Sequence, residues 1–130
     1  MDDAALALRI VGLLEERKGE RIVVIDMREV SIPTGFFVVA TADNPVHVKA
    51  LINALREGLP MKPTHGEGIT ERRWVVLDYG HVVVHLFQRE ARDFYDIESL
   101  WADHLIAPSE LASDDGSRTT AEAARLDQTS

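Results

Sequence analysis

The chain has 130 residues, 45% of them apolar, which supports one hydrophobic core and is too short for two ordinary domains. It contains no cysteine, which excludes disulfides and thiolate metal sites. The net charge of −8 disfavours direct binding to nucleic-acid phosphates and favours a basic protein as partner. No apolar run approaches the roughly 20 residues that cross a bilayer, and no basic signal region follows Met1, so we expect a cytoplasmic protein.

The N-terminal stretch predicts a helix followed by a strand. Asp2 or Asp3 can cap the helix, and apolar residues recur along it at helical spacing. Gly19 is expected to end the helix in the left-handed conformation. Residues 21–27 are almost uniformly apolar, which predicts a strand buried on both faces.

A second strand and a second helix follow. Residues 36–41 are rich in β-branched and aromatic side chains and predict the strand. Asn44-Pro45 pairs an N-cap residue with proline at the first helical position, and Gly58 marks the end of the helix. Residues 61–72 contain prolines and glycines and predict a loop with a short strand around 67–70.

Residues 73–87 predict a β-hairpin whose two turn residues are Tyr79 and Gly80. With this turn, Trp74 lies opposite His85, and Asp78 lies opposite His81. One face of the hairpin is entirely aliphatic and is a predicted core face: Val75, Leu77, Val82, Val84 and Leu86. The other face mixes large apolar and titratable side chains: Trp74, Val76, Asp78, His81, Val83, His85 and Phe87. This mixed face suits a partner, although a helix that covers it is an equal alternative.

Residues 89–106 predict a third helix, with an apolar stripe made of Phe94, Ile97, Trp101 and Leu105. Pro108 ends this helix. We therefore expect a folded domain over residues 1–107 and a disordered, polar, acidic tail over 108–130. The order α-β-β-α-(β)-β-β-α predicts a single α/β (α+β) domain, in which helices pack on one mixed sheet of four to five strands.

The sequence gives little support to an enzyme, metal or cofactor site. It contains neither phosphate-binding glycine loop nor a nucleophile elbow. His81 and His85 are four residues apart on one strand, so their Cα atoms lie roughly 13 Å apart and cannot share a metal. Asp26 and Asp78 could support a nucleotidyltransferase-like activity only if the fold brought them together. We expect a protein that is not an enzyme and uses no cofactor.

Four stretches, Glu67-Gly68, 74–80, 82–87 and 92–101, together resemble the ribosomal silencing factor family, also called RsfS or iojap. The resemblance consists of a Trp-x-x-x-Asp-x-Gly hairpin, a Val-His pair on the return strand and the pattern Arg-x-x-Tyr-x-x-Glu-x-Leu-Trp. It covers about residues 4–106. The chain departs from the family where His81 replaces an acid after the hairpin glycine, at residues 34–36, and at Ala42-Asp43. His81 weakens the acidic hairpin tip and would make its charge depend on pH.

The resemblance implies a fold like a nucleotidyltransferase core without its catalytic carboxylates. It implies a protein that binds the large ribosomal subunit through the basic fourteenth large-subunit protein and prevents joining of the small subunit, which lowers translation when nutrients are short. Homodimers are also implied. Together with the mixed hairpin face, it predicts five partner-binding residues: Glu67, Trp74, Asp78, His81 and His85. A large-subunit assembly factor, a nucleotidyltransferase-like enzyme and a dimeric module with a non-ribosomal partner are the alternatives.

Overall fold

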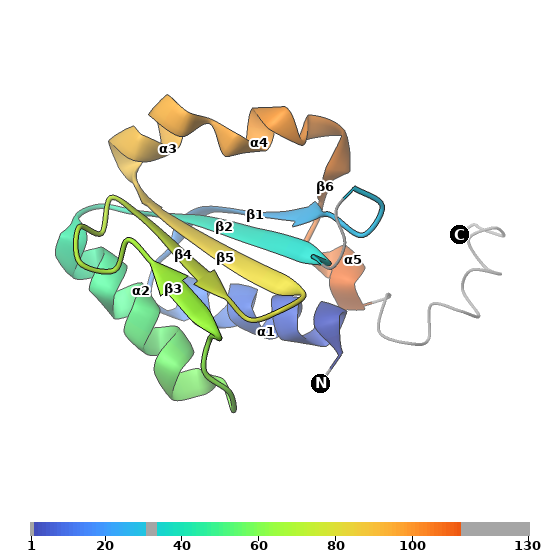
Figure 1. The fold of residues 1–130 in the computed structure, drawn as a ribbon, viewed down its shortest axis with the longest axis horizontal. Helices are drawn as coiled ribbons and strands as arrows, with labels where there is room; N and C mark the ends of the chain where they lie inside the picture. Colours follow the sequence, from blue (N-terminus) through green and yellow to red (C-terminus); the bar gives the residue numbers. More distant parts are fainter. Residues whose placement is uncertain (1, 31–33, 113–130) are drawn as a thin grey trace, which may run out of the picture.

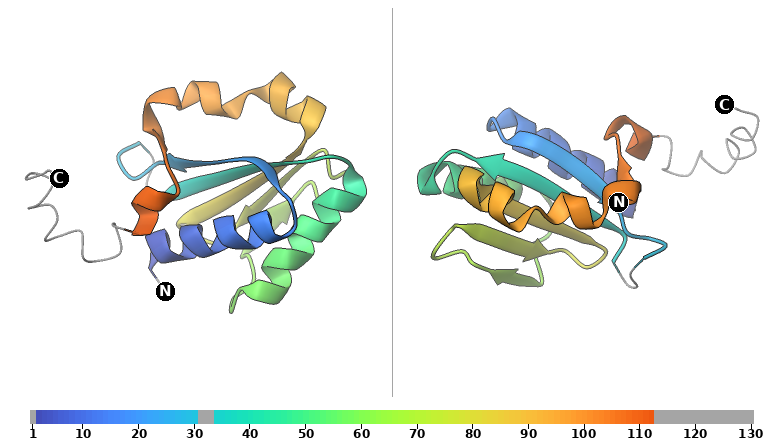
Figure 2. Two further views of the ribbon diagram at one scale, coloured as in Figure 1. Left: turned by 180° about the vertical axis from the view of Figure 1, so that it is seen from behind. Right: turned by 90° about the horizontal axis from the view of Figure 1, so that it is seen from above.

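The computed structural model describes residues 2–30 and 34–112, which form one sheet with helices on both faces (Figure 1). Its elements in chain order are α1 (Asp3–Glu16), β1 (Glu20–Asp26), β2 (Phe36–Ala42), α2 (Pro45–Gly58), β3 (His65–Glu67), β4 (Trp74–Asp78), β5 (Val82–Gln88), α3 (Arg89–Tyr95), α4 (Ile97–Leu100), the 3-10 helix η1 (Ala102–His104), β6 (Leu105–Ile106) and α5 (Ser109–Ala112). α1 and α2 cover one face of the sheet, and α3 and α4 lie across the other (Figure 2).

The sheet has the strand order β3-β4-β5-β2-β1-β6. β2 and β5 are parallel, and all other neighbours are antiparallel. The predicted mixed sheet in an α+β domain is confirmed, with six strands instead of four or five. β3 lies slightly earlier than the predicted short strand. The predicted burial of the first strand on both faces holds only at Val24 and Ile25 of β1. The first two residues of β1 are exposed, and its other three are half-buried.

Both long helices begin as predicted. Asp2 Oδ1 accepts a hydrogen bond of 2.8 Å from the backbone N–H of Ala5, and Asn44 Oδ1 accepts one of 2.8 Å from that of His47. These bonds satisfy donors that the first helical turn leaves unpaired. At the end of α1 the left-handed residue is Lys18, with a φ of 65°, and not the glycine that follows it.

The aliphatic face of the hairpin lies in the core against α1 and α2, as predicted. The predicted register is wrong by two residues, because Trp74 pairs with Phe87 and Asp78 pairs with Val83. This register moves the two-residue turn by one position, from Tyr79-Gly80 to Gly80-His81, and the backbone N–H of Tyr79 donates to the carbonyl oxygen of Val82 at 2.9 Å. Since a shift of two residues keeps each side chain on its own face, the assignment of the two faces survives the error.

The predicted third helix is interrupted. Asp96 has φ 44° and ψ 48°, a left-handed conformation that ends α3 and directs the chain into the short α4. Leu105–Ile106 forms β6 and pairs with β1 instead of continuing a helix. Of the predicted buried stripe, Ile97 is buried and Trp101 is half-buried, whereas Phe94 and Leu105 are exposed.

The region after Pro108 also differs from the prediction. Ser109–Ala112 forms α5, which packs against α1 and places Leu111 in the hydrophobic core. The prediction of a disordered tail over 108–130 is therefore wrong for residues 109–112, which form α5. The rest of the predicted tail, residues 113–130, lies outside the described residues.

Candidate functional site

The mixed face of the hairpin is partly covered by α3 and α4. A second apolar cluster forms beneath these helices, made of Ile25, Met27, Val39, Phe87, Ala91 and Ile97. Phe87 is completely buried there, and His85 is 6% exposed. The alternative that a helix covers this face is thus correct for its centre, and only its margin remains available to a partner.

Trp74 lies at this margin, at the start of β4. Its ring stacks on Phe87 with a centroid separation of 4.9 Å, and its centroid lies 4.6 Å from that of Tyr95 on α3. The ring of Phe94 meets Tyr95 edge-on at 5.0 Å. Phe94 is 73% exposed and Tyr95 is 42% exposed. We call Trp74, Phe94 and Tyr95 the aromatic surface, because their rings form one continuous cluster in which Phe94 and Tyr95 are exposed and Trp74 is half-buried.

His85 supports the aromatic surface from below. Its Nδ1 accepts a hydrogen bond of 3.1 Å from the indole Nε1 of Trp74, so the proton of the neutral ring is on Nε2. Burial lowers the pKa of His85 to about 4, which keeps the ring neutral. Nε2 has no hydrogen-bond partner among the described residues, and the ring packs against Phe37 at 4.6 Å. His85 therefore has little surface to offer a partner and instead orients Trp74.

The predicted site residues Glu67 and Asp78 lie near Trp74 in the strand order of the sheet, on the edge strand β3 and on its neighbour β4. Because Glu67 pairs with Val76 across β3 and β4, Glu67, Trp74 and Asp78 share one face. The Glu67 carboxylate lies 2.9 Å from His65 Nε2. Asp78 accepts a hydrogen bond of 2.7 Å from the backbone N–H of Gly80 and thereby shapes the turn.

His81 is separated from this group. Its Nδ1 lies 3.1 Å from Oδ2 of Asp3, at the start of α1 on the opposite face of the sheet. It therefore does not form the predicted pair with Asp78. Its side chain is 54% exposed, so it stays accessible at the tip of the hairpin.

Asp26 and Asp78 do not converge. They lie on β1 and β4, which are three strand positions apart in the sheet, or about 14 Å at the usual strand spacing. Both carboxylate oxygens of Asp26 bind the guanidinium of Arg28 at 2.9 and 2.8 Å. Among the described residues, no group of three histidine or acidic side chains is placed to hold a metal ion.

Four exposed acids lie along the helical segment that carries Phe94 and Tyr95: Glu90, Asp93, Asp96 and Asp103. Glu90 forms an ion pair with Arg73 and Asp93 forms one with Arg21. Of the two arginines in this segment, Arg89 forms ion pairs with Glu20 and Asp43, and Arg92 is buried. An apolar centre with an acidic margin fits the surface of a basic protein.

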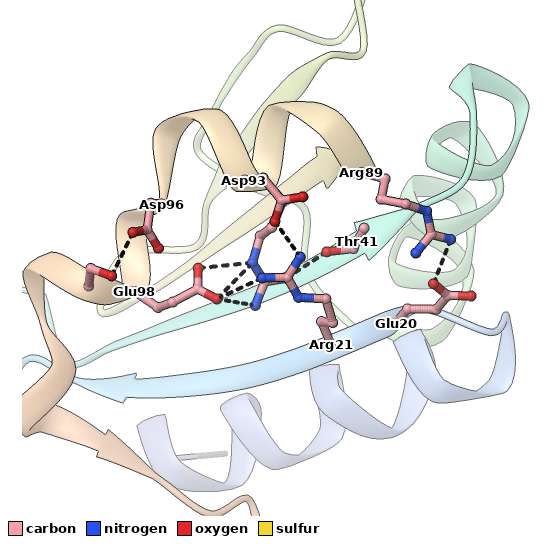
Figure 3. A network of polar contacts seen from close by, with 9 residues as sticks. Glu20, Arg21, Thr41, Arg89, Asp93, Asp96 and Glu98 are labelled. Carbon is pink, nitrogen blue, oxygen red and sulfur yellow. Dashed lines mark hydrogen bonds and ion pairs between the residues drawn. The ribbon is translucent and has the colours of Figure 1, made fainter.

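A polar network connects Glu98 and Asp93 of the helical segment with Thr41 and Arg21 of the sheet (Figure 3), and Arg92 is the residue at its centre. Its Nε and Nη2 donate to the Glu98 carboxylate at 2.9 and 3.0 Å, and its Nη1 donates to Thr41 Oγ1 at 2.7 Å. Arg21 pairs with Asp93 at 2.8 Å and with Glu98 at 3.4 Å. Burial raises the pKa of Glu98, but the hydrogen bond and charge of Arg92 outweigh it and hold that pKa below its usual value.

Sequence reasoning assigned no partner contact to Phe94 or Tyr95. The predicted continuous helix has Phe94 on its buried stripe, and Tyr95 is named only as one position of the family pattern. The signal that could have found them is the spacing of Arg92 and Glu98. Residues six apart do not share a helix face, so a direct pair between them requires a break in the helix.

Comparisons with known proteins agree on one family. The family model described as "Ribosomal silencing factor during starvation" matches residues 2–130. The ribosomal silencing factor RsfS of Chromobacterium violaceum is 37% identical over 94 residues, which are 70% of this chain and 77% of that protein. The RsfS of Halalkalibacterium halodurans is 31% identical over 108 residues, covering 79% of this chain and 91% of that protein.

Similarity extends to a plant protein and to solved structures. The chloroplastic protein Iojap of Zea mays is 30% identical over 118 residues, covering 87% of this chain and 51% of that protein. A crystal structure of a Chromobacterium violaceum protein matches with a TM-score of 0.75 at 33% identity, covering 78% of this chain and 88% of that one. A Bacillus halodurans crystal structure matches with a TM-score of 0.69 at 28% identity, covering 82% of this chain and 99% of that one.

Proposed function

Because this chain belongs to the ribosomal silencing factor family, we propose that it represses translation by binding the large ribosomal subunit and blocking the joining of the small one. Its contact on the large subunit is the fourteenth large-subunit protein, whose basic surface complements a chain of net charge −8. The mechanism is occlusion, so it requires a stable, correctly oriented complex and no chemical step.

The observation that supports this proposal best is the aromatic surface with its acidic margin. Aromatic side chains are enriched among the residues that dominate binding energy, and they act where water is excluded by their surroundings. Phe94 is 73% exposed although it is one of the largest apolar side chains in the chain. Exposure of such a side chain beside two further aromatic rings has no benefit for folding and is typical of a binding site.

The proposed contacts divide into anchors and polar partners. Trp74, Phe94 and Tyr95 are the apolar anchors. Glu67 and Asp78 lie on the same face of the adjacent strands and supply carboxylates to Lys or Arg of the partner. His81 is a peripheral contact at the hairpin tip, and His85 acts indirectly by orienting Trp74.

The test is sedimentation of the purified protein with isolated large subunits, followed by addition of small subunits to measure joining. The wild type should pellet with large subunits and reduce the amount of joined ribosomes. Phe94→Ser should weaken binding by about tenfold or more, as expected for a central apolar contact. Val46→Ser is the matched control, because Val46 is 76% exposed but lies on α2, on the opposite side of the sheet.

Each outcome discriminates among the alternatives. Binding without an effect on joining would contradict occlusion and favour a role in large-subunit assembly. No binding to large subunits would contradict the proposal and favour a partner outside the ribosome. If Phe94→Ser and Val46→Ser lose the same amount of affinity for large subunits, the docking surface does not include the aromatic surface.

A further inference from the structure

Arg92 is unusual for a charged residue, because its side chain is completely buried. All three of its nitrogen groups are used in directed hydrogen bonds, two to Glu98 and one to Thr41. Replacing a buried ion pair by apolar side chains is often neutral or stabilising, so stability alone is a weak explanation for such a pair. The geometry of the surrounding helices offers a better one.

The pair spans the point where the helical segment breaks. Arg92 lies in α3, Glu98 lies in α4, and the left-handed residue Asp96 lies between them. A single left-handed residue leaves the angle between two short helices weakly determined, and neither helix here is longer than two turns. The Arg92–Glu98 contact closes this joint. Thr41 on β2 and Arg21 on β1 connect the joint to the sheet (Figure 3).

The same two helices carry the exposed apolar side chains. Phe94 and Tyr95 are at the end of α3, and Leu100, which is 74% exposed, is at the end of α4. The angle between the helices therefore determines where Leu100 lies relative to the aromatic surface. A partner that contacts both helices meets a preformed surface only if the joint is closed, and a preformed surface avoids the entropy cost of ordering on binding.

We propose that Arg92, Glu98 and Thr41 are positioning residues that fix α3 and α4 as one rigid docking element for a basic, apolar-pocketed protein surface. This inference rests on the proposed function. It assigns a role in partner affinity to side chains that the partner does not touch. It also extends the docking surface from the hairpin, where the sequence pointed, to Leu100 on α4.

Thr41→Val is the sharpest test. The change is nearly isosteric, alters no charge and lies at a residue with 0% exposure, and it removes the hydroxyl that accepts the hydrogen bond from Arg92. Val48→Ala is the matched control, since it removes buried apolar volume from the opposite side of the sheet without touching the network. Amide hydrogen exchange and affinity for isolated large subunits are measured for both variants at a temperature where both are folded.

Thr41→Val should accelerate exchange of the amides in residues 89–104 and weaken binding about fivefold, whereas Val48→Ala should do neither at equal loss of melting temperature. The double variant Thr41→Val, Phe94→Ala should lose less affinity than the sum of the two single losses, because the contacts of Arg92 affect binding by positioning Phe94. Unchanged exchange in α3 and α4, additive losses, or equal binding by the two single variants would overturn the inference. Failure of the wild type to bind large subunits would instead refute the proposed function. Amide hydrogen exchange alone would then show whether the contacts of Arg92 rigidify α3 and α4.

Discussion

The indole N–H of Trp74 donates to Nδ1 of His85 at 3.1 Å, and this bond defines the state of both side chains. The histidine must be neutral with its proton on Nε2, and the indole N–H of Trp74 is already used and cannot donate to a partner. The binding role that we propose for Trp74 therefore depends on its ring alone. The bond also holds the indole against the rings of Phe87 and Tyr95, which fixes the orientation of the aromatic surface.

We expect the stability of the protein to fall as pH decreases below neutrality because of His85. Burial lowers the pKa of His85 in the folded state to about 4, whereas an unfolded histidine has a pKa of about 6.5. Above the unfolded pKa both states are neutral and the full stability is present. Between the two values the unfolded state binds a proton that the folded state excludes, so the free energy of unfolding decreases, by about 2 kcal/mol between pH 7 and pH 5.

Urea unfolding of the wild type and of His85→Asn at pH 7 and pH 5 measures this contribution. Asparagine retains an acceptor for Trp74 and does not titrate, so the variant should lose less stability between the two pH values than the wild type. Its absolute stability will be lower because the side chain is smaller. Equal pH dependence in the two proteins would mean that the imidazole is not held neutral by burial.

Substitutions of Trp74 should distinguish the contribution of its ring to binding from the contribution of its indole N–H to stability. Trp74→Ala removes the anchor and should cost about 2 kcal/mol of binding free energy to large subunits. Trp74→Phe keeps an aromatic ring beside Tyr95 but leaves His85 Nδ1 buried without a donor, which should cost about 1–3 kcal/mol of stability and much less affinity. Calorimetric melting together with sedimentation distinguishes the two effects. Equal affinity of a folded Trp74→Ala variant and the wild type would remove Trp74 from the site.

The sequence predicted the hairpin faces correctly because alternation is a local property. Val75 and Leu77 point to the core whatever the length of the turn. The register differs because the two turn residues are Gly80 and His81, and the Gly80 N–H donates to the Asp78 carboxylate beside this turn. Local propensity alone does not distinguish a turn at Gly80-His81 from one at Tyr79-Gly80, because glycine is a turn residue in both.

The candidate site was harder to predict because it depends on contacts between distant segments. The break at Asp96 lies within a pattern that fits a continuous helix, and it is stabilised by Arg92 binding Thr41, 51 residues earlier in the chain. The apolar stripe predicted through Phe94 assumes an unbroken helical period, and it therefore assigns this exposed residue to the core. Trp74 is predicted on the mixed face of the hairpin, but the sequence does not predict its hydrogen bond to His85.

Two glycines with positive φ should respond very differently to alanine. At Gly68, φ is 76° and an added Cβ would lie 2.0 Å from the carbonyl oxygen of Trp74, so the backbone between β3 and β4 must move. At Gly80, φ is 99° but nothing lies within 4 Å. We expect Gly80→Ala to cost about 1–3 kcal/mol from backbone strain alone and Gly68→Ala to cost clearly more.

Thermal melting and tryptophan fluorescence of the two glycine variants provide the comparison. Because Gly68 abuts the backbone of Trp74, its replacement should also change the emission of that indole and weaken binding to large subunits. Gly80→Ala should change neither. If both variants lose the same stability, the close approach at Gly68 is relaxed by a small shift and does not anchor the site.

The position of α5 predicts that the folded domain extends beyond Ala107. Leu111 has 0% exposure and packs against α1, and the carboxylate of Glu110 accepts a hydrogen bond of 3.1 Å from the Ala107 N–H. A chain that ends after Ala107 exposes this part of α1 and should lose about 2–5 kcal/mol of stability, as for loss of a buried leucine. A chain that ends after Ala112 keeps α5 and should be more stable than the shorter chain by about that amount. Urea unfolding of both truncations, with Leu111→Ala as a point-mutant comparison, would contradict this boundary if the two truncations were equally stable.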